Sequence, residues 1–397
     1  MAAPGGYAAY AHNLCAVLSN LGRSVHIVAL GSRDTSTRTD VGELHLVRNE
    51  LASRIPFIAD VQMTALPFYS FSFARRMKAI VGEQPCLMWG LGPWGLAGAL
   101  FKQRSSPAST LLVSYFTTFL HEMRGSLEAI RVRDYGLRLK LEYGAVVGVI
   151  GPAFRLMEQF LLKHADKVVT HYRSTEDILA AELALPREKF HRMTYYVETF
   201  ERPVRSPPMD GLPRPLIVTV CRQDPRKGIN FLLHALALLA ARGIDVHCLI
   251  AGGGSLLEQN RRLADRLGVS HRVIFAGFVG DVRSILEAAD VFAFPAVEEG
   301  SGSLSVLEAM CVGAPMVVTD ADGLTEDVEH GQSGLVVSSK DATALADALQ
   351  TLLTDRALAR RLGQGARDAY QRKFSITAMR RDVETLLRAF DIRAPSD

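Results

Sequence analysis

Several features that assign a protein to a narrow class are missing from this chain of 397 residues. Its five cysteines are scattered and form no C-x-x-C pair, so we expect reduced thiols rather than a disulfide framework or a zinc site. The chain also has no Walker-type phosphate loop, no histidine-rich metal set and no Ser/His/Asp pattern. We therefore expect neither a bound metal nor a cofactor.

An excess of charge of one sign and long hydrophobic runs are missing too. The net charge is only +3, which is too small to indicate a nucleic-acid partner. No uninterrupted apolar run reaches about 18 residues, so the sequence predicts no transmembrane helix. The N-terminus lacks the basic and then apolar segments of a signal peptide. With 48% hydrophobic and 22% charged residues, the composition is typical of a cytoplasmic globular enzyme.

What is present is an alternation of strand and helix patterns along the whole chain. Strands separated by helices of this length predict parallel βαβ units, and so an α/β fold with doubly wound sheets. Residues 198–215 interrupt the alternation with five prolines in a mostly polar run, which indicates a linker. Since 397 residues exceed what one hydrophobic core usually serves, we predict one domain over residues 1–200 and a second over 201–373.

The stretch from Phe294 to Thr319 carries the most informative pattern. It reads as a strand, a Gly/Ser turn, a helix and a second strand, an order that gathers backbone N–H groups around one point and suits an anion. Glu299 precedes the turn, and Glu308 lies a little over one helical turn beyond Ser303. This fits a ligand with phosphate in its middle and hydroxyls at both ends, such as a nucleotide-sugar. A solvated glutamate pair in a surface loop is the alternative, and this stretch alone does not separate the two.

Two further segments have the composition of phosphate-binding loops. Arg222 and Lys227 follow a predicted strand and come just before a helix, and ligands bind at such strand ends in open α/β sheets. Two cations there share the charge of a diphosphate, although a solvated basic loop has the same composition. Near the start of the chain, Gly5 and Gly6 stand before a helix, where backbone approaches a phosphate closely.

Other motifs are weaker. The glycine run at residues 251–255 follows a strand but has Leu257 in place of the third glycine of G-x-G-x-x-G, which disfavours a dehydrogenase. His121 is expected in a polar loop at the end of a strand. The helix predicted over residues 60–81 carries a basic cluster, residues 75–78, beside four aromatic residues. Two interpretations of this helix stay open, docking on anionic lipid and covering its own sheet, and the second is favoured.

Together these stretches resemble the GT-B-fold retaining glycosyltransferases of family 4, also called glycosyl transferases group 1. The resemblance covers nearly the whole chain and is looser in the first half. It rests on Gly5, Gly6, SVHIVAL from 24, His121 and HADKVVT from 164, then on the Arg222–Gly228 loop, AGGG from 251, RVIFAGFVGDV from 272, AADVFAFPAVEEG from 288, LEAMCVGAP from 307 and GQSGLVV from 331.

The resemblance implies a fold and an activity. The fold would be GT-B, with two Rossmann-like domains facing across a cleft and the last helix, in residues 374–397, crossing back to the first domain. The activity would be metal-independent transfer of a sugar from a UDP- or GDP-linked donor, with retention at the anomeric carbon. The acceptor would be a sugar, a lipid-linked sugar or a small molecule, and an enzyme of this kind would be cytoplasmic or at the inner face of the cytoplasmic membrane. A sugar phosphorylase, a nucleotide-sugar epimerase and a catalytically silent nucleotide-sugar binder remain alternatives.

By the same resemblance, the donor-binding residues take separate roles. Arg222 and Lys227 would hold the donor diphosphate, and Glu308 would bind the ribose. Backbone near Val279 would meet the nucleobase. The remaining backbone contacts to phosphate or sugar would come from Ser303, Leu304, Gly5 and Gly6.

Two residues would act on the transferring sugar. His121 would lie close to it, and Glu299 would bind its hydroxyls as the first glutamate of the family's E-x7-E pair. The family spacing counted back from Glu308 lands on Gly300, however, so Glu299 is one residue too early. Either the loop bulges by one residue to bring Glu299 into this role, or another group takes the role.

A second departure concerns the start of the chain. In a doubly wound sheet, the glycine turn before the first helix is fed by a strand in the interior of the sheet. Only four residues precede Gly5, too few for that strand. We therefore expect that the reading frame begins further upstream or that the chain is a fragment.

Overall fold

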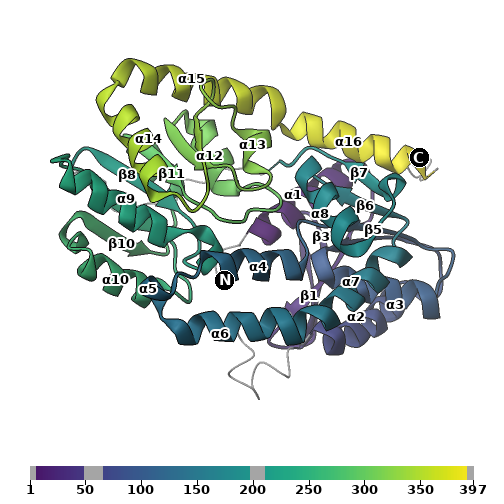
Figure 1. Cartoon of the computed structure of the whole chain (residues 1–397). Helices are drawn as coiled ribbons and strands as arrows, with labels where there is room; N and C mark the ends of the chain where they lie inside the picture. Colours follow the sequence, from purple (N-terminus) through teal and green to yellow (C-terminus); the bar gives the residue numbers. More distant parts are fainter. Residues whose placement is uncertain (1–5, 49–65, 197–210, 391–397) are drawn as a thin grey trace.

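The computed structural model describes residues 6–48, 66–196 and 211–390, and it is an α/β structure with three sheets in those residues (Figure 1). The chain enters through α1 (Gly6–Asn20). Tyr10, Leu14 and Val17 of α1 are buried and recur at helical spacing, so this face of the helix packs into the core.

The first half of the chain contains two of the sheets. The strands of the three-stranded sheet, in the order β1-β3-β2, are β1 (His26–Gly31), β3 (Gly42–Arg48) and β2 (Thr35–Thr39). The strands of the four-stranded sheet are β4 (Leu87–Leu91), β5 (Thr110–Ser114), β6 (Lys167–Thr170) and β7 (Phe190–Arg192), and all three of its pairings are parallel. Within the described residues β1 and β4 are both edge strands.

The second half forms one parallel sheet of six strands in the order β10-β9-β8-β11-β12-β13. Its strands are β8 (Leu216–Val220), β9 (His247–Ala251), β10 (Val273–Gly277), β11 (Val291–Phe294), β12 (Met316–Thr319) and β13 (Leu335–Val337). The chain runs outward from β8 to one edge and then returns to β11, so β8 and β11 lie side by side at the point where the order reverses. Ligands of such sheets bind at the carboxyl ends of these two strands.

Helices cover the six-stranded sheet. They are α9 (Ile229–Ala241), α10 (Leu257–Arg266), α11 (Val282–Glu287), α12 (Leu304–Val312), α13 (Leu324–Asp327), α14 (Ala342–Thr354) and α15 (Arg356–Lys373). Leucines of α9 and α14 pack with Ile217, Val291 and Val317 of the central strands in one buried cluster. This packing fixes the loops at the strand ends.

The last helix returns to the first half of the chain. Figure 1 shows α16 (Ile376–Ala389) leaving α15 and running beside β7. It contacts α1, and the backbone N–H of Thr194 donates to Asp382 of α16 at 2.8 Å. The linker predicted over 198–215 lies mostly outside the described residues.

The helices of the first half differ most from the sequence-based prediction. No single helix spans residues 127–142, although the apolar pattern there predicts one, because Gly136 adopts a φ of +87° that breaks the helix. The helices in order are α2 (Leu66–Val81), α3 (Leu96–Arg104), α4 (Phe119–Ala129), α5 (Val132–Tyr135), α6 (Leu137–Ala145), α7 (Gly151–His164) and α8 (Arg173–Leu183). The helix predicted over 60–81 begins at Leu66 in the described residues, and 60–65 lie outside them.

One π-helical turn, η3 (Val146–Ile150), joins α6 to α7. The resulting helix, Leu137–His164, is long and apolar enough to cross a membrane by length and composition, with a mean hydropathy of 1.4 in its most apolar window. Only 28% of that window is buried in the structure. The expectation of no such helix is therefore corrected, because glycines and polar residues interrupt the apolar run without ending the helix.

Helix α2 covers the first sheet, as the favoured interpretation predicts. Tyr69 and Phe73 are buried, and Phe73 packs with Val47 of β3. Phe71 is exposed and carries Arg104 over its ring. Two of its three basic residues are engaged, since Arg76 donates to Ser36 and Lys78 pairs with Glu83.

Candidate functional site

The predicted donor loops meet at the carboxyl ends of β8 and β11. The loop after β8 leads through the short helix η5 (Pro225–Lys227) into α9, and the loop after β11 leads into α12. The backbone N–H of Val297 donates to the carbonyl of Arg226 at 2.7 Å, which holds the two loops together. Gly228 is required at this contact, because it has a φ of +67° and a Cβ there would lie 2.0 Å from the carbonyl oxygen of Pro295.

Two cations of the first loop, Arg226 and Lys227, face the acids of the second. Lys227 is buried, donates to Glu299 and lies over the ring of Phe294 at 5.5 Å. Arg226 is also largely buried, and its guanidinium lies 3.2 Å from Glu298. Ion pairs thus join the two loops.

Arg222 occupies the outer side of this cluster. Its side chain is 68% exposed and lies 3.2 Å from Asp224. It also lies 3.9 Å from Glu122 of α4, which contacts Arg226 at 3.0 Å. The first half of the chain therefore contributes an acid to the same charge network.

Glu299 reaches this network despite its position in the chain. A turn closes from Glu299 to Gly302, in which the N–H of Gly302 donates to the carbonyl of Glu299 at 3.0 Å. Gly302 has a φ of +69° there. The side chain of Glu299 points to Lys227 from this turn.

Helix α12 begins directly after this turn. Ser303 is its N-cap residue but makes no side-chain cap, and its hydroxyl lies 3.1 Å from that of Ser305 instead. The N–H groups of the first helical turn have no partner within the helix. The N-terminus at Ser303 and Leu304 is therefore suited to bind an anion.

Glu308 lies further along α12. Burial raises the pKa of its carboxyl to about 7. A carboxyl group held in an apolar setting gains from a polar ligand that hydrogen-bonds it. Val279 follows β10 and packs against a buried apolar cluster that contains residues of both halves.

His121 belongs to a helix rather than to the predicted loop. It is the third residue of α4, whose first turn is capped because the backbone N–H of His121 donates to the Thr118 hydroxyl at 3.0 Å. Its Nε2 lies 3.3 Å from Asp322. Burial lowers the pKa of His121, but the hydrogen bond to Asp322 and the charges of Asp322, Glu298 and Glu182 outweigh it, so that the pKa is raised.

Asp322 connects the histidine to the glutamate loop. Its other carboxylate oxygen accepts the backbone N–H of Glu299 at 2.9 Å. Burial tends to raise the pKa of Asp322, but His121 and this N–H lower it overall. His121, Glu298 and Asp322 also offer ligand atoms within 4.8 Å of one another, so these three residues are the part of the cleft that a cation would suit.

The two halves of the chain touch beside the site through polar contacts. The Thr175 hydroxyl donates to the carbonyl of Gly300 at 2.5 Å, and Tyr172 donates to Asp327 at 2.9 Å. The first two N–H groups of α8, those of Arg173 and Ser174, both donate to the carboxylate of Glu326 at 2.9 Å. A cavity of about 330 Å³ lies elsewhere, lined by residues of α5, α9 and α14.

The structure thus brings together most of the residues that the sequence singled out. Lys227, Glu299, Ser303 and Leu304 lie on the two joined loops, with Arg222 at their outer side. Gly6 is the first residue of α1, and Gly5 lies outside the described residues.

Sequence reasoning missed one cation, Arg226, and three acids of the charge network. Arg226 stands in the quoted basic loop and Glu298 beside Glu299, so both were visible as neighbours of chosen residues. Asp322 and Glu122 had no such signal, since only the fold brings them here.

The glycine run at 251–255 has a structural function. A Cβ at Gly252 would lie 2.0 Å from the carbonyl oxygen of Cys221, and one at Gly254 would lie 2.5 Å from that of Gln223. The N–H of Gln223 donates to the carbonyl of Gly253 at 2.8 Å. The run therefore supports the loop that carries Arg222.

Comparison with known proteins identifies the family. Residues 5–195 match the family described as "Glycosyl transferase 4-like domain", and residues 210–369 match "Glycosyl transferases group 1". The chain belongs to the glycosyl transferases group 1. The resemblance stated from the sequence is confirmed, and retention of configuration is a separate question.

Relatives of this group 1 glycosyltransferase chain match it over part of their length. The GDP-mannose-dependent alpha-(1-6)-phosphatidylinositol monomannoside mannosyltransferase of Mycobacterium tuberculosis is 36% identical over 163 residues, which are 39% of this chain and 42% of that protein. The chain thus matches less than half the length of this curated relative.

Solved structures resemble the chain over nearly its whole length. Sucrose-phosphate synthase from Thermosynechococcus elongatus has a TM-score of 0.77 at 23% identity and covers 98% of this chain and 94% of its own. Anabaena Alr3699/HepE in complex with UDP-glucose has a TM-score of 0.66 at 17% identity, with 98% and 97% covered. The fold is GT-B, as predicted.

Proposed function

We propose that this chain is a glycosyltransferase that moves a sugar from a nucleotide-diphosphate donor to an acceptor with retention of anomeric configuration. The observation that carries the proposal is the convergence of Arg226 and Lys227 on the glutamate loop that opens α12, with Arg222 at the outer side of the same basic loop. Cations and helix N-terminal N–H groups at one point bind a diphosphate. The named activity of the mycobacterial relative and the UDP-glucose bound to Alr3699/HepE support a nucleotide-sugar donor.

The donor would lie across the ends of β8 and β11. Arg222 and Lys227 would hold its diphosphate, Glu308 its ribose and the backbone near Val279 its base. The breaking bond leaves a diphosphate, so stabilisation of that leaving group is the largest catalytic term. In this proposal the basic loop and the α12 N-terminus supply it, without a metal ion.

Glu299 and His121 would act at the transferring sugar. Glu299 would bind the hydroxyls of the sugar once the diphosphate has displaced Glu299 from Lys227. His121, which Asp322 orients at 3.3 Å, would lie near the anomeric carbon. For retention, the acceptor would attack from the face that the leaving phosphate vacates, and that phosphate would take the acceptor's proton.

The test is turnover with a panel of UDP- and GDP-sugars and with sugar, lipid-linked and small-molecule acceptors. We expect acceptor-dependent release of the nucleoside diphosphate. Proton NMR of the first product from an α-linked donor should show an α-linkage. A β-linked product would overturn retention, and no release with any pair would overturn the activity.

A catalytically silent nucleotide-sugar binder is the second candidate. It is favoured by one observation, that Glu299 already neutralises the Lys227 charge that a diphosphate needs. Such a protein would bind donors in calorimetry without turnover. A phosphorylase or an epimerase using the same site would instead convert the donor without a sugar acceptor, which product analysis with and without acceptor detects.

We further propose a cytoplasmic enzyme in peripheral contact with anionic membrane, through α6, η3 and α7 rather than α2. Leu137, Leu141, Val149 and Leu156 are 58–76% exposed along this helix, which lies at the lower edge in Figure 1. A π turn takes in about one extra residue, which keeps these side chains on one face. Exposed basic residues flank them, Arg133, Arg138 and Arg155. An apolar face with basic flanks suits an anionic lipid surface.

A further inference from the structure

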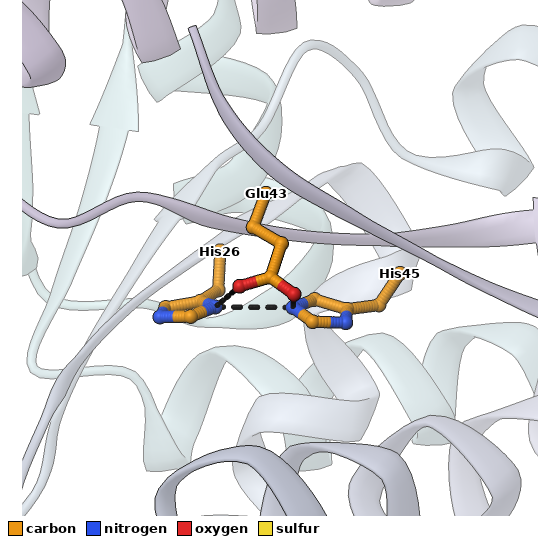
Figure 2. A group of neighbouring side chains, drawn as sticks. All are labelled: His26, Glu43 and His45. Carbon is orange, nitrogen blue, oxygen red and sulfur yellow. Dashed lines mark hydrogen bonds and ion pairs between the residues drawn. The ribbon is translucent and has the colours of Figure 1, made fainter. Parts of the chain in front are cut away.

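Away from the donor loops, the three-stranded sheet brings two imidazole rings and a carboxylate together. His26 is the first residue of β1, and Glu43 and His45 belong to β3. His26 and Glu43 are partners in the parallel register, and residues two apart on a strand face the same side. The three side chains therefore project from one face of a rigid sheet (Figure 2).

The ligand atoms of the three residues converge. His26 Nδ1 lies 3.0 Å from His45 Nε2, and the Glu43 oxygens lie 3.7 Å from the first nitrogen and 4.0 Å from the second. Figure 2 shows the carboxylate facing the space between the two ring nitrogens. Ligand atoms bound to one zinc ion at about 2.0–2.2 Å lie about 3.3–3.6 Å apart when the geometry is tetrahedral, so small side-chain movements would complete the site.

A second shell orients the inner histidine. His45 Nδ1 lies 2.8 Å from the Ser36 hydroxyl oxygen, to which Arg76 donates at 2.7 Å. When Nδ1–H donates to that oxygen as well, the lone pair of Nε2 points at the cluster. A metal-bound histidine is held by a hydrogen bond of this kind.

A simple hydrogen bond between the two rings would account for the 3.0 Å distance between their nitrogens. It does not account for the position of Glu43, whose two oxygens face one nitrogen of each ring. Two neutral nitrogens and one carboxylate within reach of one point are a donor set for a divalent transition metal.

We propose that His26, Glu43 and His45 form a binding site for a divalent transition metal, with Zn²⁺ as the expected ion and water as a fourth ligand. The site joins β1 to β3, and Ser36 of β2 supports it. The proposed donor residues lie on loops of the other, six-stranded sheet. The ion would therefore act on stability, as a crosslink of the first sheet.

The experiment is a zinc titration of tag-free protein by calorimetry, in competition with a chelator of known affinity. His26→Gln and Glu43→Gln change partly exposed residues and should fold. Each should lower zinc affinity at least about tenfold, and Ser36→Ala should lower it by about 10–100-fold through the second shell. Added zinc should raise the melting temperature of the original chain and leave that of His26→Gln unchanged.

His121→Gln is the matched control, because His121 belongs to the other His/carboxylate cluster of the described residues. It should leave the zinc affinity and the zinc-dependent rise in melting temperature as they are. Equal zinc affinity of the original chain and His26→Gln would overturn the proposal. Loss of zinc binding in His121→Gln alone would overturn it too.

Discussion

Lys227 binds Glu299 across the two donor loops, although 72 residues separate them in the chain. The side chain that is expected to hold a diphosphate is therefore already paired with an acid. A bound diphosphate must take the place of Glu299 on that ammonium group. The diphosphate and Glu299 compete for the Lys227 ammonium group. Removal of Glu299 and removal of Lys227 should therefore change the affinity for a nucleoside diphosphate in opposite directions.

Glu299→Gln should strengthen the binding of UDP or GDP, because it frees the charge of Lys227, while it slows sugar transfer. Lys227→Ala should weaken binding by about tenfold or more, since a charge-assisted contact contributes about 1.5–3 kcal/mol. Calorimetry with each nucleoside diphosphate measures both effects. Arg283→Ala, in an exposed pair on α11, is the control and should bind as the original chain does. Weaker binding by Glu299→Gln would contradict the competition.

Glu308 should make stability depend on pH. Its pKa is about 7 in the folded protein against an ordinary 4.5, so the folded state holds this proton more tightly. The resulting stabilisation is complete below about pH 4.5 and is lost as the pH rises through 7, a change of up to about 3 kcal/mol. Glu308→Gln removes it, so the melting temperature of the variant relative to the original chain should rise between pH 5 and 8.

The control for this pH series is Glu287→Gln, which changes an exposed glutamate of α11. The difference in melting temperature between this variant and the original chain should not change between pH 5 and 8. A flat difference for Glu308→Gln as well would show that burial of this carboxyl does not affect its ionisation. Asp327 and Glu158 also have raised pKa values, of about 8 and 7, and are the same in all three proteins, so the comparison cancels them.

Gly302→Ala should destabilise the protein by more than the backbone cost of placing alanine at a positive φ, because its Cβ would also clash with Tyr172. Gly302 has a φ of +69°, and a Cβ there would lie 2.4 Å from the Tyr172 ring. Gly268 has a similar φ of +71° with nothing within 4 Å, so Gly268→Ala measures the backbone cost, about 1 kcal/mol. Urea unfolding should give a clearly larger loss for Gly302→Ala. Equal losses would mean that Tyr172 moves aside freely.

The exposed leucines of α6 and α7 should bind vesicles. Leu141→Gln with Leu156→Gln should reduce co-sedimentation with vesicles that contain anionic lipid, because each change removes exposed apolar area from the interface. Phe278→Ser is a control of similar exposure on the second half of the chain and should leave sedimentation unchanged. Sedimentation equal in the double variant and the original chain would exclude this face as the contact.

The sequence predicted the second half closely, because its strands are short apolar runs with turn residues between them. The order predicted for Phe294–Thr319, a strand, a turn, a helix and a strand, is found as β11, α12 and β12, and the last strand ends at Thr319. The strand β2 was missed because its sequence, TSTRT, is polar and mostly exposed. No regular spacing of hydrophobic residues marks such an edge strand, although threonine favours the β conformation.

The charge network of the site was predictable only in part. Lys227 and Glu299 were named from their motifs, whereas Asp322 and Glu122 come from loops and helices without one. Their role depends on which segments the fold brings side by side, and local spacing carries no information about that. The His26, Glu43 and His45 cluster was missed for the same reason, since β1 and β3 pair through a register that no single stretch encodes.

Glu326 has a consequence for how a donor would enter and leave. Its carboxylate accepts two N–H groups from the start of α8, as an anion would. Water replaces hydrogen bonds to a charged group at a net cost of about 1.5–3 kcal/mol each. Separation at Glu326 itself breaks only these polar bonds, whereas Tyr172 and Leu324 belong to one buried apolar cluster that also joins the two halves. The two hydrogen bonds of Glu326 can re-form each time they break, which suits an enzyme that must release a product after every turnover.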